Sequence, residues 1–560
     1  MNKPNTPVTF SDLLQLIEAD MSLHPYKAAN LKSSIRRYLR AVNWTETMEA
    51  SFPRVRKALA GSLPATLDVS KGTWANTRSD LKFVLTRYGV PTRAPLRKDL
   101  QPGWCQLRDM IDKDPSLIRG LSNFIHWCSR QNISPLDVSE EIMARYLIDL
   151  RERSLKNNPE SLHRRVCVLW NKASSVYDKW PGTPVPLPSY RKTISLPWEA
   201  FPISFMNDLD HYQAFMSGED LLSAHAIDKP RRPATLNAHR EAFRRIASAM
   251  VRSGFSIEKL TSLKQLVREN NLIAGLRAYE AHLGNLKCPS VSEMLGCLIS
   301  LAANYLRSDK QTLKMLRDIR GRTVVRQRGM TDKNMDRLRQ FASPKNVGAF
   351  ITMADTLLIE RAKLKSSSKK ALRTQTALMH EIMLIAPIRA KNLTTLHISN
   401  NFRRVGSGPT LRVFMVLPSD EVKNHRDMEF EFPKYLISLL DEYLNKYRRS
   451  LLPKGADNGW LFPGRDGQHK NQVSIGDQLC KAMLRLTGIK INPHLYRHIA
   501  AYLYLEANPG GYETVRLLLG HTSSDTTVMF YAGFSDTNAC RHYADMLSER
   551  RISTNKERSK

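Results

Sequence analysis

The stretch "NPHLYRHIAAYLYL", residues 492–505, places a histidine and an arginine three residues apart at the start of an apolar run with helical spacing. Asn492 suits the N-cap of a helix, and Pro493 suits its first position because proline has no N–H group to leave unpaired. Residues three apart share a helix face, so His494 and Arg497 are expected to point the same way. The free N–H groups of a first helical turn favour an anion. The stretch therefore predicts an anion-binding site.

The composition of the chain narrows the kind of anion. The 560 residues include 85 Lys and Arg against 53 Asp and Glu, which gives a formal charge of +32 in a chain that is 42% hydrophobic. Folded proteins with this balance usually bind a polyanion, most often nucleic acid. The plain alternative is a basic protein without such a partner. A chain of this length predicts three or four domains, and its basic residues are spread over all of them.

Cysteine usage and hydropathy indicate the compartment. The seven cysteines are scattered, with no CxxC pair or Cys/His cluster, which argues against zinc fingers and a disulfide framework. The N-terminal "MNKPNTPVTFSDLL" lacks the apolar core of a secretory signal. The most apolar windows are too short and interrupted to span a bilayer. The sequence therefore predicts a soluble cytoplasmic protein without membrane association.

Proline-rich breaks divide a chain that otherwise has helical periodicity. Two of them, 91–103 and 181–202, are long enough to be linkers, and shorter ones begin at Asp228 and Ser343. The predicted parts are an N-terminal helical domain (1–95), a second helical domain ending in a proline-rich linker (96–225), a third helical domain (226–342), a C-terminal domain (343–550) and a basic disordered tail (551–560). The second and third parts follow the same pattern: a helix, a short turn ("QNIS" or "SGFS") and further helices. The pattern fits either an internal duplication or two unrelated bundles.

Strand signals concentrate in one segment. Residues Leu411–Pro433, "LRVFMVLPSDEVKNHRDMEFEFP", contain two β-rich runs around a polar connection, which predicts a hairpin. Helical patterns precede and follow this segment. The fold class predicted is a set of mainly α N-terminal domains followed by a mixed α+β C-terminal domain with a small antiparallel sheet.

Further polar residues stand at the ends of elements around the opening stretch. In "PIRAKNL", Arg389 follows an apolar helix and a proline, and Lys423 lies in the hairpin connection. In "LLLGH", Gly520 suits a helix C-cap and His521 follows it at once, while Tyr531 comes ten residues later. Each residue alone has an ordinary explanation as a surface cation, a cap contact or a half-buried aromatic.

In this order, the arginine, the hairpin lysine, "HLYRH", "LLLGH" and the tyrosine resemble the tyrosine recombinase (phage integrase) family. The catalytic domain of that family carries Arg, Lys, His-x-x-Arg, His or Trp, and Tyr in the same order. The resemblance is closest over 490–534 and extends more loosely back to about Gly348. It implies an enzyme that breaks and rejoins DNA. The catalytic residues that it implies are Arg389, Lys423, His494, Arg497, His521 and Tyr531.

The chemistry explains why these residue types belong together. In-line attack on a phosphodiester builds negative charge on the phosphoryl oxygens, and the guanidiniums of Arg389 and Arg497 suit those oxygens. The resemblance implies that Tyr531 is the nucleophile and forms a 3′-phosphotyrosine, and that His494 is the acid and base for the tyrosyl proton. It also implies that His521 contacts the phosphate and that Lys423 gives a proton to the leaving 5′ oxygen. No metal ion or other cofactor is expected, because protein cations take the metal's place and the phosphotyrosine conserves the bond for rejoining.

Some features depart from the family pattern. The position three after the first arginine is often acidic in the family and is Asn392 here. Lys391 and Lys434 compete with Lys423 for the role of the catalytic lysine. Residues 226–342 have the position and helical pattern of the family's core-binding domain, which closes a clamp around duplex DNA with the catalytic domain. Residues 96–225 resemble a second core-binding-like bundle, while the role of residues 1–225 stays unassigned.

The function predicted is a site-specific recombinase, the integrase or transposase of a bacterial mobile element, acting on double-stranded DNA through a Holliday junction near the nucleoid. The resemblance also implies a homo-tetramer on two DNA sites, with accessory recombination proteins as further partners. A last amphipathic helix after Tyr531 would link subunits or pack on its own domain. The alternatives are a telomere resolvase, an enzyme like the type IB topoisomerases, a catalytically inactive DNA-binding regulator and a structural nucleoid protein. The complete set of catalytic residues favours the recombinase.

Overall fold

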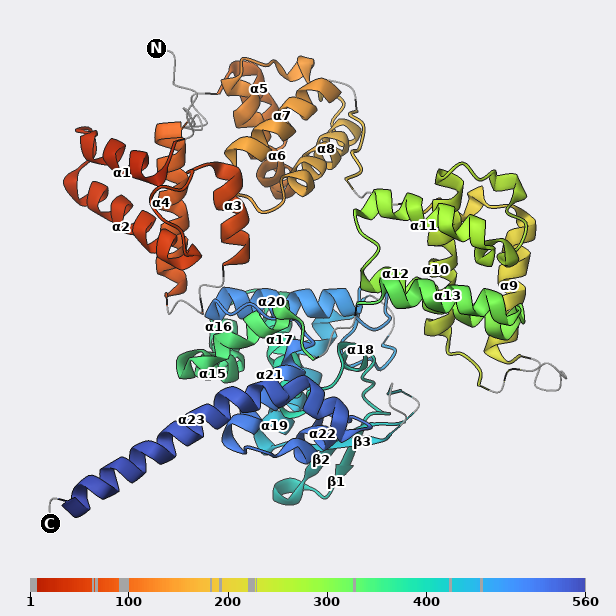
Figure 1. The fold of residues 1–560 in the computed structure, drawn as a ribbon. Coiled ribbons are helices and arrows are strands. Elements are labelled where there is room, and N and C mark those ends of the chain that lie inside the picture. The colour runs from red at the N-terminus through yellow and green to blue at the C-terminus, as the bar shows by residue number, and fades with distance from the viewer. Residues whose placement is uncertain are drawn as a thin grey trace. The chain divides into compact units, whose positions relative to one another are not determined.

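The structure, a computed structural model, describes residues 8–62, 65, 69–89, 100–181, 184–190, 194–219, 227, 229–325, 329–419, 421–422, 426–453 and 457–558. These residues form many helices and a three-stranded antiparallel sheet near the C-terminal end of the sequence (Figure 1). The predicted fold class, mainly α with a small antiparallel sheet, is confirmed. None of the helices in the described ranges is long and apolar enough to cross a lipid bilayer.

The first bundle has a core of its own, built around Phe10, Ile35 and Tyr38, none of which exposes any surface. Its helices are α1 (Phe10–Ala19), α2 (Pro25–Val42), α3 (Phe52–Gly61) and α4 (Lys71–Gly89). Helix α1 begins at a capping box, in which the Thr9 N–H group donates to the Asp12 carboxylate at 2.7 Å and the Asp12 N–H group donates back to the Thr9 hydroxyl.

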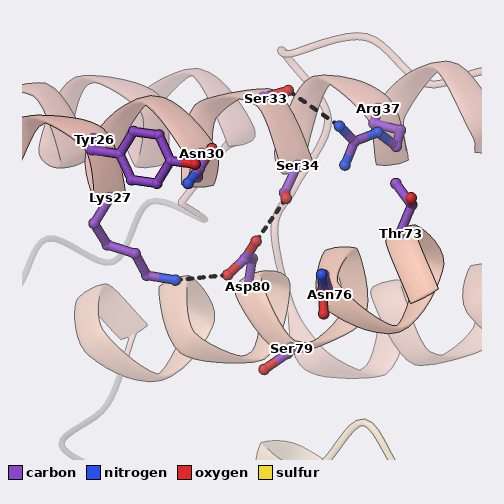
Figure 2. Close-up of a pocket in the computed structure, with 10 residues that line it drawn as sticks. All are labelled: Tyr26, Lys27, Asn30, Ser33, Ser34, Arg37, Thr73, Asn76, Ser79 and Asp80. Atoms are coloured by element: carbon purple, nitrogen blue, oxygen red, sulfur yellow. Dashed lines mark hydrogen bonds and ion pairs between the residues drawn. The ribbon is translucent and has the colours of Figure 1, made fainter.

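Polar side chains join α2 to α4 across a cavity of about 510 Å³ (Figure 2). The Asp80 carboxylate of α4 accepts hydrogen bonds from Lys27 Nζ at 2.8 Å and from Ser34 Oγ at 2.7 Å. Arg37, on the same helix as Lys27, donates to Ser33 Oγ at 3.3 Å. The two helices are therefore held together by charge-assisted bonds as well as by their apolar faces.

The second bundle packs aromatic side chains. Its helices are α5 (Pro102–Met110), α6 (Pro115–Arg130), α7 (Glu140–Arg153) and α8 (Pro159–Val176). Phe124 lies at the centre, with its ring centroid 5.1 Å from that of Tyr146 and 5.9 Å from that of Trp170. Helix α6 starts where the Asp114 carboxylate accepts two backbone N–H groups and a proline takes the first helical position.

Residues 188–327 form a separate compact unit. Its helices are α9 (Ile203–Ser217), α10 (Pro233–Arg252), α11 (Glu269–Leu283), α12 (Pro289–Ser300) and α13 (Lys310–Thr323). The sequence predicts that 203–217 belongs to the second domain, but this helix packs in the core of the third bundle, where the rings of Tyr212 and Phe243 lie 5.2 Å apart. The reason is that the chain changes domain in the proline-rich segment 181–202, whose described residues hold only a short 3-10 turn, and not at the later break.

The C-terminal part surrounds one long buried helix. Its elements are α14 (Asp332–Arg339), α15 (Pro344–Ile351), α16 (Met353–Ala362), α17 (Ser367–Ile385), α18 (Ala390–Thr394), β1 (Phe402–Val405), β2 (Arg412–Leu417), β3 (Met428–Glu431), α19 (Lys434–Glu442), α20 (Gln472–Thr487), α21 (Leu495–Ala507), α22 (Tyr512–Leu519) and α23 (Ser524–Arg558). Helix α17 is buried on all sides in its second half, because α16, α19, α20 and α21 all pack on it. Its second half is therefore mostly apolar, although His380 and Glu381 are buried there as well.

The predicted hairpin is confirmed as strands β2 and β3. They pair antiparallel, with Phe414 opposite Glu431 and Leu417 opposite Met428. Strand β1, which the sequence does not predict, pairs with the other edge of β2. Its four residues, "FRRV", are mostly exposed and too few to give a clear strand pattern, so pairing with β2 is what establishes the strand.

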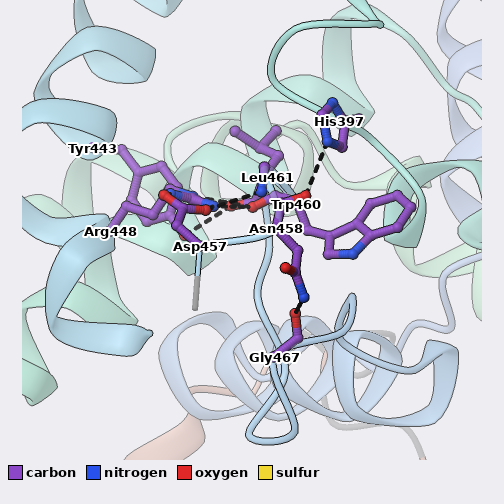
Figure 3. Close-up of polar contacts among 9 residues, drawn as sticks. His397, Tyr443, Arg448, Asp457, Asn458, Trp460, Leu461 and Gly467 are labelled. Atoms are coloured by element: carbon purple, nitrogen blue, oxygen red, sulfur yellow. Dashed lines mark hydrogen bonds and ion pairs between the residues drawn. The ribbon is translucent and has the colours of Figure 1, made fainter. Parts of the chain in front are cut away.

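A buried arginine fixes the segment that leads into α20 (Figure 3). Arg448 donates to both Asp457 oxygens at 2.5 Å and to the Trp460 carbonyl at 3.0 Å from Nε. These hydrogen bonds hold the pKa of Asp457 well below its ordinary value, at about 2. Beside them, the Tyr443 hydroxyl donates to the Leu461 carbonyl at 3.0 Å. The segment is thus attached to the core at two neighbouring backbone positions.

Helix α23 continues further than the sequence predicts. A helix is expected over "SDTNACRHYADML", followed by a disordered tail from residue 551, yet the helix runs through Arg558. No proline or glycine follows Gly533. Adding residues to an existing helix needs no new nucleation, so the polar segment 551–558 can extend it.

Glu381→Gln is expected to stabilise the C-terminal domain at about pH 8 but not at about pH 5. Glu381 lies on α17 with 7% of its surface exposed, and burial raises its pKa to about 7 from 4.5. The folded state therefore favours the protonated acid and loses stability as the pH rises from about 4.5 to about 7. Glutamine removes that loss, worth about 3 kcal/mol, and thermal unfolding at both pH values measures it.

The control for this prediction is Glu429→Gln, which changes an exposed glutamate of β3. We expect it to shift the unfolding midpoint equally at both pH values. A Glu381→Gln effect that is the same at both pH values would show that Glu381 stays charged in the folded protein.

Candidate active site

The sequence predicts Asn492 as the N-cap of helix α21, but the helix begins later and its N-cap position is His494. The Asn492 side chain accepts the Leu495 N–H group at 2.9 Å, and Leu495 is the first helical residue. Pro493 and His494 form a turn before it. His494 therefore lies at the helix entrance, with Arg497 inside the first turn.

Arg497 is buried, with 3% of its surface exposed, and two backbone carbonyls hold it. Nη1 donates to the Pro387 carbonyl at 2.7 Å, and Nη2 donates to the Leu519 carbonyl. The first carbonyl precedes α18 and the second ends α22. One guanidinium thus ties three parts of the domain together at the start of α21.

Arg389 lies close enough to Arg497 to affect its charge. Arg389 is half-buried and occupies the N-cap position of α18, two residues after Pro387. Burial and the neighbouring Arg389 charge lower the pKa of Arg497 to about 10. Burial also lowers the pKa of Arg389. Two cations held together in this way favour the binding of an anion between them.

Tyr531 lies in the same place, on α23. Helices α21, α22 and α23 pack on one another (Figure 1), and Tyr531, 2% exposed, joins their small apolar cluster with Leu505 and Leu519. Its hydroxyl oxygen is 2.9 Å from Nδ1 of His498. Burial raises the pKa of Tyr531, and the Arg497 charge opposes the rise. The Tyr531 hydroxyl is therefore protonated in this state, and it lies close enough to Arg497 for the arginine charge to affect its pKa.

His498 is the site residue that the sequence does not predict. It is 5% exposed, and burial together with the charges of His494, Arg497 and His521 lowers its pKa to about 3. A neutral ring whose proton is on Nε2 accepts at Nδ1, and in that tautomer the Tyr531 hydroxyl donates to it. The signal was present in "HLYRH", where His498 follows Arg497 directly, but the order of residues does not say which histidine meets the tyrosine.

The two predicted histidines lie at the edge of this group. The His494 ring meets the His498 ring edge-on, with centroids 4.9 Å apart, and the surrounding protein together with Arg497 and Arg389 lowers the His494 pKa. His521 follows Gly520, which adopts the predicted left-handed C-cap with φ 60°. Burial and the nearby arginines lower the His521 pKa to about 4. In the described ranges, no group of three or more His, Cys, Asp or Glu side chains could hold a metal ion.

The structure thus brings Arg389, His494, Arg497, His521 and Tyr531 together. The sixth predicted residue, Lys423, lies outside the described residues. Asn392, at the position that is often acidic in the family, is buried and donates from Nδ2 to the Glu421 carbonyl at 3.1 Å. It therefore anchors the start of the connection that carries Lys423. The choice of Lys423 over Lys391 and Lys434 stays a prediction.

One comparison with known proteins matches the part of the chain that contains the site. A family model described as the phage integrase family matches residues 358–537, a range that contains all the predicted site residues. No curated protein sequence matches the chain.

Similar solved structures include three of recombinases. XerH site-specific recombinase bound to difH substrate, in a pre-cleavage complex, is 18% identical, with 53% of this chain and 76% of that chain covered and a TM-score of 0.35. XerH bound to a palindromic difH substrate, in a post-cleavage complex, is 17% identical, with 56% and 80% covered and a TM-score of 0.37. A lambda integrase dimer bound to a COC′ core site is 12% identical, with 69% and 89% covered and a TM-score of 0.32.

The family model covers the segment that runs from the end of α16 into α23, and so includes every element that contributes to the site. Residues 358–537 therefore form a catalytic domain of the phage integrase family, the tyrosine recombinases, which break and rejoin DNA.

Proposed function

We propose that this protein is a site-specific DNA recombinase that cleaves duplex DNA with Tyr531 and forms a covalent 3′-phosphotyrosine. The observation that carries the proposal is the position of the Tyr531 hydroxyl, which is hydrogen-bonded to His498 beside buried Arg497, with half-buried Arg389 next to Arg497. A tyrosine nucleophile needs cations close by to stabilise the charge that develops on the phosphate. The formal charge of +32 supports DNA as the partner.

The arginines are suited to hold the scissile phosphate. The bonds to Pro387 and Leu519 use two of the five N–H groups of Arg497 and fix its plane, so the remaining N–H groups are preorganised. Arg389 supplies the second guanidinium, and His521 and His494 supply further donors. Because Arg497 is buried and Arg389 and His521 are partly buried, their interactions with an anion are stronger than they would be in water.

In the cleavage step, the Tyr531 oxygen attacks the phosphorus, a Tyr–O–P bond forms, and the bond from phosphorus to the 5′ oxygen breaks. His498 takes the tyrosyl proton, since Nδ1 already accepts it in a hydrogen bond. The part predicted for His494 is then indirect, through its contact with the His498 ring. Lys423 gives a proton to the leaving 5′ oxygen. Reversal of these steps by another 5′ hydroxyl rejoins the strand.

The finer assignment rests on family membership. We infer that the protein is the integrase or transposase of a mobile element, that it acts as a tetramer on two DNA sites, and that strand exchange passes through a Holliday junction. No residue of the predicted catalytic set is replaced in this chain. This observation favours a recombinase over a regulator that has lost catalysis.

The test uses a duplex from the end of the encoding element, nicked so that the short 5′ fragment diffuses away after cleavage. We expect a protein–DNA adduct on a denaturing gel, with the nucleotide attached to the peptide that contains Tyr531. Tight binding of the same DNA without an adduct would instead favour a DNA-binding regulator.

His498→Leu is expected to slow adduct formation by about a hundredfold. Leucine fills the buried space but cannot accept the Tyr531 hydroxyl, so the nucleophile loses both its proton acceptor and its fixed position. The rate of adduct formation with excess enzyme measures the effect.

His498→Asn is the matched variant for this prediction. Its Oδ1 can accept the same hydrogen bond, so we expect it to recover part of the lost rate. If the leucine variant cleaves faster than the wild type, the hydrogen bond to His498 inhibits attack by Tyr531. If the leucine and asparagine variants form the adduct at the same rate, the hydrogen bond has no part in the reaction.

A further inference from the structure

The second bundle contains a cavity of about 770 Å³ with an uneven distribution of charge. It is lined by α6, α7 and α8, with two side chains of α4, and we refer to it as the basic groove. Buried Trp127 and Tyr146 lie among its lining residues, as does one acidic residue, Asp149. Its six basic residues are Lys82, Arg119, Arg130, Arg153, Lys156 and Arg165.

Most of these cations have no acidic partner. Arg153 pairs with Asp149, at 3.4 Å. In the part of the chain that the structure describes, no carboxylate lies within ion-pair distance of the other five. Arg119 and Arg130 use Nε to bond carbonyls of their own helix, at 3.1 Å and 3.3 Å. These bonds orient the side chains and leave the Nη groups to a ligand.

Two basic residues of the same bundle outside the groove are neutralised. Arg151 pairs with Glu160 at 2.9 Å, and Lys172 pairs with Asp114 at 2.9 Å. The groove differs from the rest of the bundle in that its cations line one cavity together. Like charges gathered in this way repel one another and destabilise the fold unless an anion binds there.

We propose that the basic groove binds duplex DNA outside the segment held by the catalytic domain, an inference that rests on the proposed function. Four of its six cations are arginines, whose planar donors fit phosphate oxygens in pairs. Duplex DNA presents a charge about every 1.7 Å along its axis, so it can neutralise several cations of one groove at once. The amides of Asn123 and Gln131, which also line the groove, suit contacts to phosphate and sugar. A recombinase with this second DNA contact would hold its site together with the flanking DNA.

The test compares two triple variants of the full-length protein. The groove variant carries Arg119→Gln, Arg130→Gln and Arg165→Gln. The control carries Lys113→Gln, Arg164→Gln and Lys179→Gln, which remove three charges from exposed residues of the same bundle that do not line the groove. Binding of a random-sequence duplex, longer than the catalytic domain can cover, is measured over a range of salt concentrations. Circular dichroism confirms that both variants are folded.

We expect the groove variant to bind about tenfold more weakly and to lower the slope of log affinity against log salt by about 2 to 3, because three phosphate contacts are lost. The control is expected to match the wild type. A groove variant that binds with the wild-type affinity and slope would overturn the proposal and point to an acidic protein surface as the occupant. Adduct formation on the nicked duplex is scored separately. Its absence in the wild type would count against the proposed function and not against the groove.

Discussion

Tyr531→Phe is expected to abolish adduct formation on the nicked duplex, by about ten-thousand-fold or more, and to leave DNA binding unchanged. Only the hydroxyl oxygen is lost, and the ring still fills the cluster between α21, α22 and α23. Because that oxygen is the proposed nucleophile, no other group of the site can form the phosphotyrosine. Gel assays of adducts and of non-covalent binding on the same DNA separate the two effects.

The same substitution has a predicted effect on stability. Without the hydroxyl, buried His498 Nδ1 loses the partner that lies at 2.9 Å, which costs about 1 to 2 kcal/mol. Replacing both residues, as in the double variant with His498→Leu, removes the unpaired atom, and we expect part of the stability to return. An adduct that persists in Tyr531→Phe would assign the nucleophile to another tyrosine, with Tyr504 and Tyr512 packed against the same cluster.

Arg497→Lys is expected to lower the rate of adduct formation by about a thousandfold and to destabilise the domain by about 3 kcal/mol. A lysine ammonium cannot donate to the Pro387 and Leu519 carbonyls with the fork geometry of a guanidinium, and it cannot hold two phosphate oxygens at the same time. Both losses arise from one side chain because it contacts the fold and the site together. Single-turnover cleavage and thermal unfolding measure the two effects.

The matched control is Arg485→Lys, which changes an arginine of the same domain that pairs with Glu360 at a partly exposed position. We expect it to change stability by less than about 1 kcal/mol and to leave cleavage intact. Full cleavage by Arg497→Lys would exclude this arginine from phosphate binding. Lost cleavage at normal stability would mean that its carbonyl contacts contribute little to the fold.

Local signals in the sequence predict much of the catalytic domain. The β-rich runs around a polar connection predict β2 and β3, and a glycine at the end of an apolar helix predicts where His521 begins its loop. These features depend on residues that are close together in the chain. They can therefore be recognised without knowledge of the tertiary structure.

The features that the sequence does not predict depend on distant segments. Strand β1 exists because β2 offers an edge for pairing, and its four residues are too short a run to predict a strand. The partner of Tyr531 depends on how α23 approaches α21, which places His498 and not His494 against the hydroxyl. The membership of α9 in the third bundle likewise depends on packing with α10.

The double attachment of Arg497 has a consequence for how such a protein changes over generations. Its guanidinium supports the ends of two neighbouring elements, so a mutation there removes folded protein as well as activity. Replacing Tyr531 by phenylalanine removes only the reaction. Copies of the gene that drift under selection for DNA binding alone should therefore lose the tyrosine well before the arginine. The presence of Arg497 in such a descendant would therefore indicate that the fold is kept, and would not indicate that the protein still cleaves DNA.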